Sequence, residues 1–155
     1  MDWRPPGWKY LPKEGLEGWT EKVFYALLEV SVLALPALLA TTAFGPDIVG
    51  QSLGASVSLL SLVLGVGTAK SGFSPLDAEW PRFSPTTVLA RTLWYNGAIL
   101  AAGFGGRAID VLLFERLGTL VFAVAVSLVA VATLPRFAAS VRRLFAWWTW
   151  GRPFP

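Results

Sequence analysis

The sequence lacks two residue types that carry much of protein chemistry, cysteine and histidine. Their absence excludes disulfides, iron–sulfur clusters, thiolate zinc sites, His-ligated haem and histidine proton relays. No GxGxxG or Walker pattern occurs, and no histidine or cysteine is available to activate a serine in a hydrolase-type triad. Candidate bases and nucleophiles do not cluster elsewhere in the sequence. We therefore expect no cofactor, no metal site and no enzymatic activity.

Charged residues are also scarce. They make up 15% of the 155 residues and hydrophobic residues 54%, whereas a typical soluble domain is about 25% charged. A surface with so little charge is suited to contact with lipid over much of its area. The chain is long enough for three or four membrane-spanning helices with short connections. The predicted fold is an all-α integral membrane protein, a bundle of four transmembrane helices in two hairpins with interfacial amphipathic N- and C-terminal segments.

The stretch of residues 48–69 contains twenty-two residues and no charged side chain. A helix of that length spans roughly 33 Å, which matches the hydrocarbon core of a bilayer. Small residues recur along it at intervals of three or four, and they are Gly50, Gly54, Ser58, Ser61, Gly65 and Thr68. Such a strip lets another helix approach closely in lipid. We expect this helix to be the central packing element, facing another helix of the chain or a partner protein.

Apolar runs and helix-breaking residues divide the chain into three parts. Residues 1–22 are predicted to form a cytoplasmic, interfacial N-terminal segment, residues 23–134 the transmembrane domain, and residues 135–155 a basic, tryptophan-rich interfacial tail. The predicted spans cover residues 23–44, 48–69, 86–106 and 117–134. Pro36 is expected to kink the first span, and Pro135 is expected to end the fourth.

The third span is interrupted by more polar residues than the others. Before it, the triplet Phe-Ser-Pro occurs twice, and the second copy predicts a helix that starts with Ser84 as N-cap and Pro85 at its first position. Within it, Gly97, Ala101 and Gly105 repeat the four-residue spacing of small residues. This face is predicted to pack on the second helix. Residues 107–116 are amphipathic and are expected to be interfacial rather than spanning.

The C-terminal tail combines basic and aromatic residues. Its predicted lipid-interface residues are Arg136, Arg142, Arg143, Trp147, Trp148 and Trp150. A basic, aromatic amphipathic helix favours the headgroup layer and anionic lipid headgroups. Three arginines beside four apolar spans are too few to indicate nucleic-acid binding. The expected partners are therefore the bilayer with its anionic headgroups and a membrane protein or further copies of the chain.

The distribution of Lys and Arg predicts the orientation. With four spans, the N-terminal segment holds four, the middle connection and the start of the third span hold three, and the tail holds four. These eleven lie on the side of the two termini, whereas the opposite side holds two, Arg107 and Arg116. Because cytoplasmic segments carry an excess of Lys and Arg, both termini are expected in the cytoplasm of a multi-pass protein of the cell membrane.

Two charged residues fall inside predicted spans, where charges are functional candidates by default. Glu29 lies seven residues past Lys22 and Arg91 six residues past Pro85, so each sits roughly 10 Å deep on the same side. The two can form a structural ion pair, can reach the headgroups separately, or Glu29 can be a proton- or cation-binding carboxylate in a translocation path. Two intramembrane amides, Gln51 and Asn96, are expected to form hydrogen bonds between helices.

A glutamate in the first of four spans resembles the arrangement in the small multidrug-resistance transporters, four-helix proteins with an essential glutamate in their first helix. The resemblance rests on Glu29 and the helix count, and it implies transport around that residue. The long N-terminal segment, the sixteen-residue middle connection and the tryptophan-rich tail depart from those compact proteins. The leading hypothesis is a non-enzymatic accessory, scaffolding or self-associating membrane component. The alternative is a small proton- or cation-coupled transporter or channel acting as a homo-oligomer around Glu29.

Overall fold

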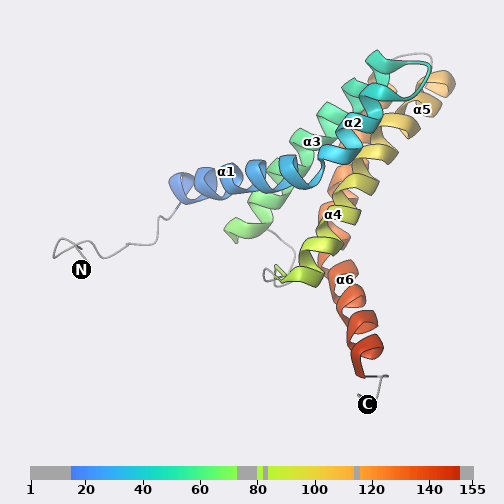
Figure 1. The fold of residues 1–155 in the computed structure, drawn as a ribbon. Coiled ribbons are helices and arrows are strands. Elements are labelled where there is room, and N and C mark those ends of the chain that lie inside the picture. The colour runs from blue at the N-terminus through green and yellow to red at the C-terminus, as the bar shows by residue number, and fades with distance from the viewer. Residues whose placement is uncertain (1–14, 73–79, 82–83, 114–115, 151–155) are drawn as a thin grey trace.

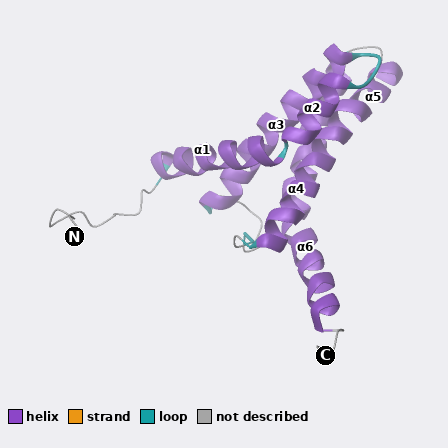
Figure 2. Ribbon diagram, in the orientation of Figure 1, coloured by secondary structure: helices purple, strands orange, loops and turns teal. Residues whose placement is uncertain are grey.

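The structure, a computed structural model, describes residues 15–72, 80–81, 84–113 and 116–150, with the side chains of residues 113 and 147–150 excepted. Within these ranges every regular element is a helix and there is no strand (Figures 1 and 2). In chain order the helical segments are α1 (Leu16–Leu33), α2 (Leu35–Ala43), α3 (Ile48–Ser71), α4 (Pro85–Leu100), the π-helical η1 (Ala101–Gly105), α5 (Gly106–Leu113) and α6 (Leu117–Trp150).

Two of the described helices are long and apolar enough to cross a membrane, over Ile48–Lys70 and Leu117–Ala146. The bent pair α1 and α2 makes a third if it counts as one span. These helices are compatible with a membrane location. The predicted third span does not qualify as a single helix, since α4 has 16 residues and is followed by the π-helical segment.

The predicted first span is broken rather than kinked. Helix α1 ends at Leu33, α2 starts at Leu35, and the two are bent by 56° at this break. Pro36 lies in the first turn of α2, and a proline inside a helix removes one backbone hydrogen bond and clashes with the preceding turn. Helix α1 starts at Leu16, so a short helical lead-in precedes the predicted span, and it projects from the bundle (Figure 1).

Helix α3 contacts every other helical segment that the structure describes, which agrees with the predicted central role of its sequence. The turn before it is closed by Asp47, whose side chain accepts a hydrogen bond from the backbone of Gly50 over 3.1 Å. The helix ends at Gly72, which has a φ of 80°, a left-handed conformation that glycine adopts without strain. Both ends are thus fixed by residues suited to helix capping.

The third predicted span and the amphipathic stretch after it form one continuous helical run, because α4, η1 and α5 follow one another without a gap. The run starts as predicted, with Ser84 as N-cap accepting from the backbone of Thr87 and Pro85 in the first turn. At its far end the Asp110 carboxylate accepts from the backbone N–H of Thr119, 2.8 Å away. Asp110 therefore caps the start of α6 from the neighbouring helix, with α5 packed on α6.

The expected helix end at Pro135 is wrong, because α6 runs without interruption through Pro135 to Trp150. Membrane helices tolerate an internal proline where neighbouring groups compensate for the lost backbone bond. Two contacts hold α6 against α4 on either side of Pro135, although the carbonyl that a residue-135 N–H would have bonded is that of Val131. The Trp94 indole N–H donates to the carbonyl oxygen of Ala130 over 2.8 Å, and its ring stacks on Phe137 with centroids 4.2 Å apart.

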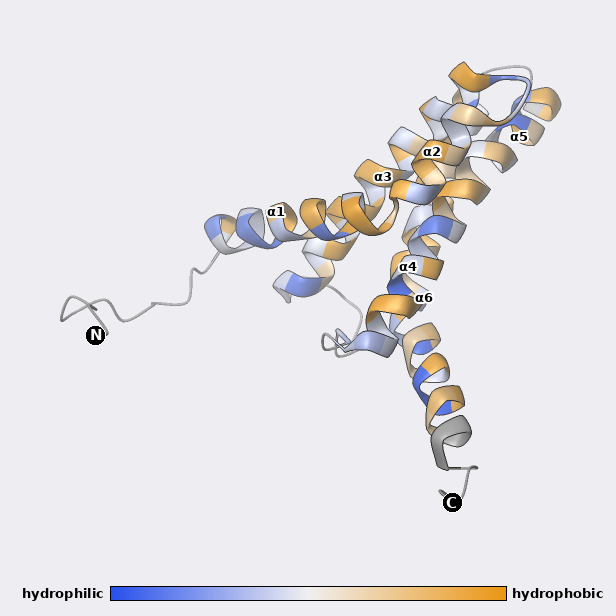
Figure 3. Ribbon diagram, in the orientation of Figure 1, coloured by the Kyte–Doolittle hydropathy of each residue, from blue (hydrophilic) through white to orange (hydrophobic). Residues whose placement is uncertain are grey.

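Helix α3 lies at the centre of the bundle, and its most extensive contacts are with α6 and α1. The turn between α2 and α3 and the segment α5 lie at one end of the bundle, while the end of α3 and the start of α4 lie toward the other (Figure 1). The core is built from small and medium apolar side chains, among them Val30, Leu62, Ile99 and Leu134, which are fully buried. Figure 3 shows hydrophilic residues at the start of α1, at the end of α3 and, between hydrophobic ones, along the C-terminal part of α6.

Candidate functional site

A carboxylate from α1 lies at the point where α1, α3 and α4 meet. The Glu29 Oε1 atom accepts from Arg91 Nη1 over 2.8 Å and from the Tyr95 hydroxyl over 3.1 Å. The Glu29 Oε2 atom forms an ion pair with the Lys70 ammonium group. Each carboxylate oxygen therefore has a cationic donor, and the four side chains form the Glu29 cluster.

The cluster is largely shielded from solvent. The exposed fraction of the side chain is 1% for Arg91, 9% for Glu29 and 19% for Lys70, and Tyr95 is fully buried. An isolated ion at such a place is poorly solvated and must be paired and hydrogen-bonded. Lys70 is the most exposed member and lies in the last turn of α3.

Arg91 is also held by the connection that leads into its own helix. Its Nη2 atom donates to the carbonyl oxygen of Pro81 over 2.5 Å. Its guanidinium carbon lies 5.7 Å from the centroid of the Trp80 ring, within the range of a cation–π interaction. Arg91 thus joins α1, α4 and the residues just before α4.

The chemistry open to this arrangement is limited. The Glu29 carboxylate accepts three hydrogen bonds from positioned donors, so a proton or metal cation would have to displace them. No group of three or more Asp, Glu, His or Cys residues that could hold a metal ion occurs in the described ranges. The cluster is therefore suited to holding three helices together.

Sequence reasoning brought Glu29 and Arg91 to the same depth, and the structure brings them together. It missed the other two members. Tyr95 follows Arg91 by four residues, which places both on one face of a helix, and that spacing could have revealed it. Lys70 was assigned to the connection after the second helix, but α3 continues through it to Ser71. Extending the predicted helix by one residue would have included Lys70.

Asn96 occupies the break between α1 and α2. Its Nδ2 atom donates to the carbonyl of Leu33 over 2.7 Å, and its Oδ1 atom accepts from the backbone N–H of Ala37 over 2.7 Å. In a regular helix these two backbone groups would bond to each other. The Asn96 amide thus replaces a helical hydrogen bond next to Pro36, as the predicted interhelical role required. By contrast, the buried Gln51 Oε1 atom has no hydrogen-bond partner in the described part of the chain.

The small-residue strip of α3 faces several neighbours. A Cβ atom added at Gly54 would lie 2.7 Å from the carbonyl oxygen of Ala102 in η1, and one at Gly65 would lie 2.8 Å from Val131 in α6. The Ser58 hydroxyl is buried and bonds to the Ser127 hydroxyl of α6 over 2.8 Å. These positions lie where α3 meets η1 and α6 closely.

Two further members of the strip have contacts within their own helix. The Ser61 hydroxyl donates to the carbonyl of Val57. A Cβ atom at Gly50 would lie 2.6 Å from the capping carboxylate of Asp47. The Trp19 indole N–H donates to the Thr68 hydroxyl at the other end of the strip, where α1 crosses α3.

The small residues of the third span are predicted to pack on α3, but in the structure they lie toward α6. A Cβ atom at Gly105 would lie 2.7 Å from the ring of Phe122, and one at Gly97 would have no atom within 4 Å. Ala101 lines a groove between α4 and α6. Neighbouring Gly103 approaches α3 instead, because a Cβ atom there would lie 3.2 Å from the Gln51 carbonyl oxygen. Small residues occur both on the side facing α3 and on the side facing α6, so residue size alone does not predict which helix this run packs against.

The basic residues of the tail are exposed on the C-terminal part of α6. Arg136, Arg142 and Arg143 are all exposed, and their predicted place at the lipid interface stays a prediction. The side chains of Trp147, Trp148 and Trp150 lie outside the described residues.

Comparison with known proteins gives one match. No curated protein and no solved structure is similar enough to this chain to count as a match. The family described as a domain of unknown function, DUF8215, matches residues 13–141, which include α1 to α5 and most of α6. Since the match extends over most of its length, the chain belongs to the DUF8215 family.

Proposed function

We propose that this chain is a non-enzymatic integral membrane protein that works by association, as an accessory or scaffolding subunit or by binding its own copies. The observation that carries the proposal is that donors already occupy both oxygens of the Glu29 carboxylate. This carboxylate, the main candidate for a chemical role inside the membrane, is bonded to Arg91, Tyr95 and Lys70. It is used to join helices, and its donors leave little room for a transported ion.

The proposed topology has four crossings, with both termini in the cytoplasm of the cell membrane. The crossings are the bent pair α1 and α2, the helix α3, the continuous run of α4 and η1, and α6, with α5 at the interface. The excess of Lys and Arg on the side of the termini supports this orientation. The exposed apolar side chains along the helices support contact with lipid or with another membrane protein.

Helix α1 is the element best suited to contact a partner. It projects from the bundle (Figure 1), with one side on α3 and the other open. Phe24, Tyr25 and Leu28 on the open side are 57%, 55% and 52% exposed. Aromatic side chains supply large contact areas at little entropic cost and are enriched in protein interfaces. A partner helix could cover them.

A proton- or cation-coupled transporter is the second candidate, and one observation favours it. Helices broken near the middle of the membrane often form ion and substrate sites in transporters, and α1 and α2 are bent by 56° four residues after Glu29. Against this, the backbone groups opened by the break at Leu33 and Ala37 are satisfied by Asn96. We therefore rank association first.

Measurement of the particle mass after extraction with surrounding lipid tests the proposal. The tagged full-length chain is extracted from its native membrane into polymer-bounded lipid discs, and mass and composition are determined. We expect a partner at a fixed stoichiometry, or a homo-oligomer. The variant Phe24→Ala/Tyr25→Ala should lower the partner-to-chain ratio, and Leu60→Ala, which removes an equally exposed apolar side chain from α3, should not.

Reconstitution in liposomes addresses the second candidate. The association proposal predicts no proton flux above that of protein-free liposomes. A monomeric particle together with proton flux that Glu29→Gln abolishes in a folded protein would overturn the proposal in favour of the transporter.

A further inference from the structure

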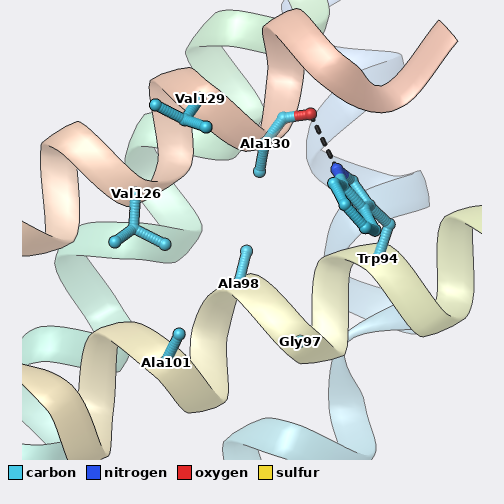
Figure 4. A pocket seen from close by; sticks show the side chains of 7 residues that line it. All are labelled: Trp94, Gly97, Ala98, Ala101, Val126, Val129 and Ala130. Atoms are coloured by element: carbon cyan, nitrogen blue, oxygen red, sulfur yellow. Dashed lines mark hydrogen bonds between the residues drawn. The ribbon is translucent and has the colours of Figure 1, made fainter. Parts of the chain in front are cut away.

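An open apolar groove lies between α4 and α6. It has a volume of about 210 Å³. Its α4 side is formed by Gly97, Ala98 and Ala101 and its α6 side by two valines and an alanine, while Trp94 lies at one end (Figure 4). The Trp94 indole N–H is already bonded to the Ala130 carbonyl. The lining thus offers an apolar surface with its one polar side-chain group satisfied.

The groove is unfilled by the described part of the chain. A Cβ atom at Gly97 would have no atom within 4 Å, and Val129 at the rim is 61% exposed. Atoms that line an empty space lose the dispersion contacts that packed atoms gain. Within a bilayer such a groove is filled by hydrocarbon. A dry cavity of roughly 150 Å³ accommodates a benzene ring, so this groove has room for a segment of an acyl chain and not for a helix about 10 Å across.

Positive charge lies next to the groove along α6. Arg136 follows Val129 by seven residues and Arg143 follows by fourteen. Because an α-helix drifts by only about 20° per seven residues, both lie on nearly the same side of α6 as Val129. Arg142 lies roughly 100° away from Arg143. No carboxylate in the described part of the chain forms a salt bridge with any of the three arginines.

We propose that the groove binds one acyl chain of an anionic phospholipid whose phosphate is held by Arg136. Arg136 lies six to ten residues beyond Val126 and Ala130 along α6, roughly 9 to 15 Å along the axis. A chain in the groove therefore places the phosphate of the same lipid near the guanidinium group, at the edge of the hydrocarbon core. Arg143 lies one further heptad out, over the headgroup layer. This proposal rests on the membrane location and is independent of the proposed association.

Native mass spectrometry of the full-length protein in detergent tests the site, with phosphatidylglycerol and phosphatidylcholine of the same chains as probes. We expect one phosphatidylglycerol to bind about tenfold more tightly than phosphatidylcholine, a difference within reach of one charged contact. Arg136→Gln should remove this preference and leave weak binding of both lipids. Gly97→Leu, which places a side chain in the open space, should lower the affinity for both lipids at least tenfold.

Two matched variants serve as controls. Arg142→Gln removes the same charge from a different side of α6, and Leu128→Phe adds bulk to a side chain that is 55% exposed and outside the groove. Neither should change lipid binding. Arg136→Gln alters an exposed residue, so its result stays informative even if Gly97→Leu fails to fold.

Three outcomes would overturn the proposal. In the first, Arg136→Gln and Arg142→Gln lose the preference for phosphatidylglycerol equally. In the second, folded Gly97→Leu binds lipid as the wild type does. In the third, the wild type is a dimer and Gly97→Leu is a monomer. The last result would assign the groove to a second copy of the chain.

Discussion

Individual side chains decide how the polar interior of this protein is satisfied. Glu29 has three donors on two other helices, so its removal leaves two cations without their carboxylate. The two cations are not equivalent. Arg91 is 1% exposed and Lys70 is 19% exposed, so only Lys70 can turn its charge toward the headgroups. The energetic consequence of losing Glu29 therefore falls mainly on Arg91.

A double-mutant cycle tests this assignment. Glu29→Gln should lower the free energy of unfolding in detergent by about 3 kcal/mol, since breaking one side of a buried pair leaves an uncompensated charge. Glu29→Gln/Arg91→Gln should recover part of that loss, and Lys70→Gln alone should have a smaller effect than Arg91→Gln. Additive losses at positions 29 and 91 would contradict the pairing.

Asn96 provides a second test at the same scale. Asn96→Leu removes both the donor to Leu33 and the acceptor for Ala37, and buried backbone groups without partners destabilise by about 1–3 kcal/mol each. We expect a loss of at least about 2 kcal/mol in thermal or denaturant unfolding. Thr92→Ala, one turn earlier on the same helix, removes a hydroxyl that bonds only within α4. An equal effect of the two changes would show that the break needs no support.

For the helices, the sequence predicts where each one lies along the chain better than which other helices it packs against. The uncharged run and its small residues were enough to place α3 and its central role, because residues 48–69 match the thickness of a bilayer. Ser84 and Pro85 were enough to place the start of α4. The helix through Pro135 was missed because packing against another helix can hold a helix together despite one lost backbone bond. Trp94, which contacts α6 at Ala130 and Phe137, lies forty-one residues before Pro135 in the chain.

The same limit applies to the candidate site. Depth counting placed Glu29 and Arg91 at one level, since both helices enter from the same side. It could not show that the side chains face each other, because rotation of each helix about its axis is fixed by packing. It also could not predict η1, where the π-helical turn brings the Ala102 carbonyl against Gly54.

A matched pair of glycine substitutions tests the packing of α3. Gly54→Ala places a methyl group 2.7 Å from a backbone oxygen, so we expect a loss of about 1–3 kcal/mol in stability. Gly97→Ala places the same group in open space, and the better helix propensity of alanine should leave stability unchanged or raised by up to about 1 kcal/mol. Thermal unfolding in detergent measures both. If Gly54→Ala is as stable as Gly97→Ala, the close approach of α3 and η1 does not contribute to stability.

For the whole molecule, the central prediction is the orientation in the membrane. The chain has no cysteine, so single cysteines can be labelled without background. Ser71→Cys lies at the end of α3 and Pro46→Cys in the turn between α2 and α3. In intact cells an impermeant thiol reagent should label Pro46→Cys, and Ser71→Cys should be labelled only after the membrane is permeabilised. The reverse pattern would refute cytoplasmic termini.

The Glu29 cluster also has a consequence for the order of events during synthesis. Lys70 and Arg91 follow Glu29 by 41 and 62 residues, so the first span is synthesised before either cation. Until Arg91 is made, the span carries a carboxylate without its most buried partner, which is unfavourable for stable insertion. Helix α3, which has no carboxylate, is the better anchor. A nascent chain released before Arg91 should therefore leave its first segment at the membrane surface, and synthesis of α4 is the step that commits it to the bilayer.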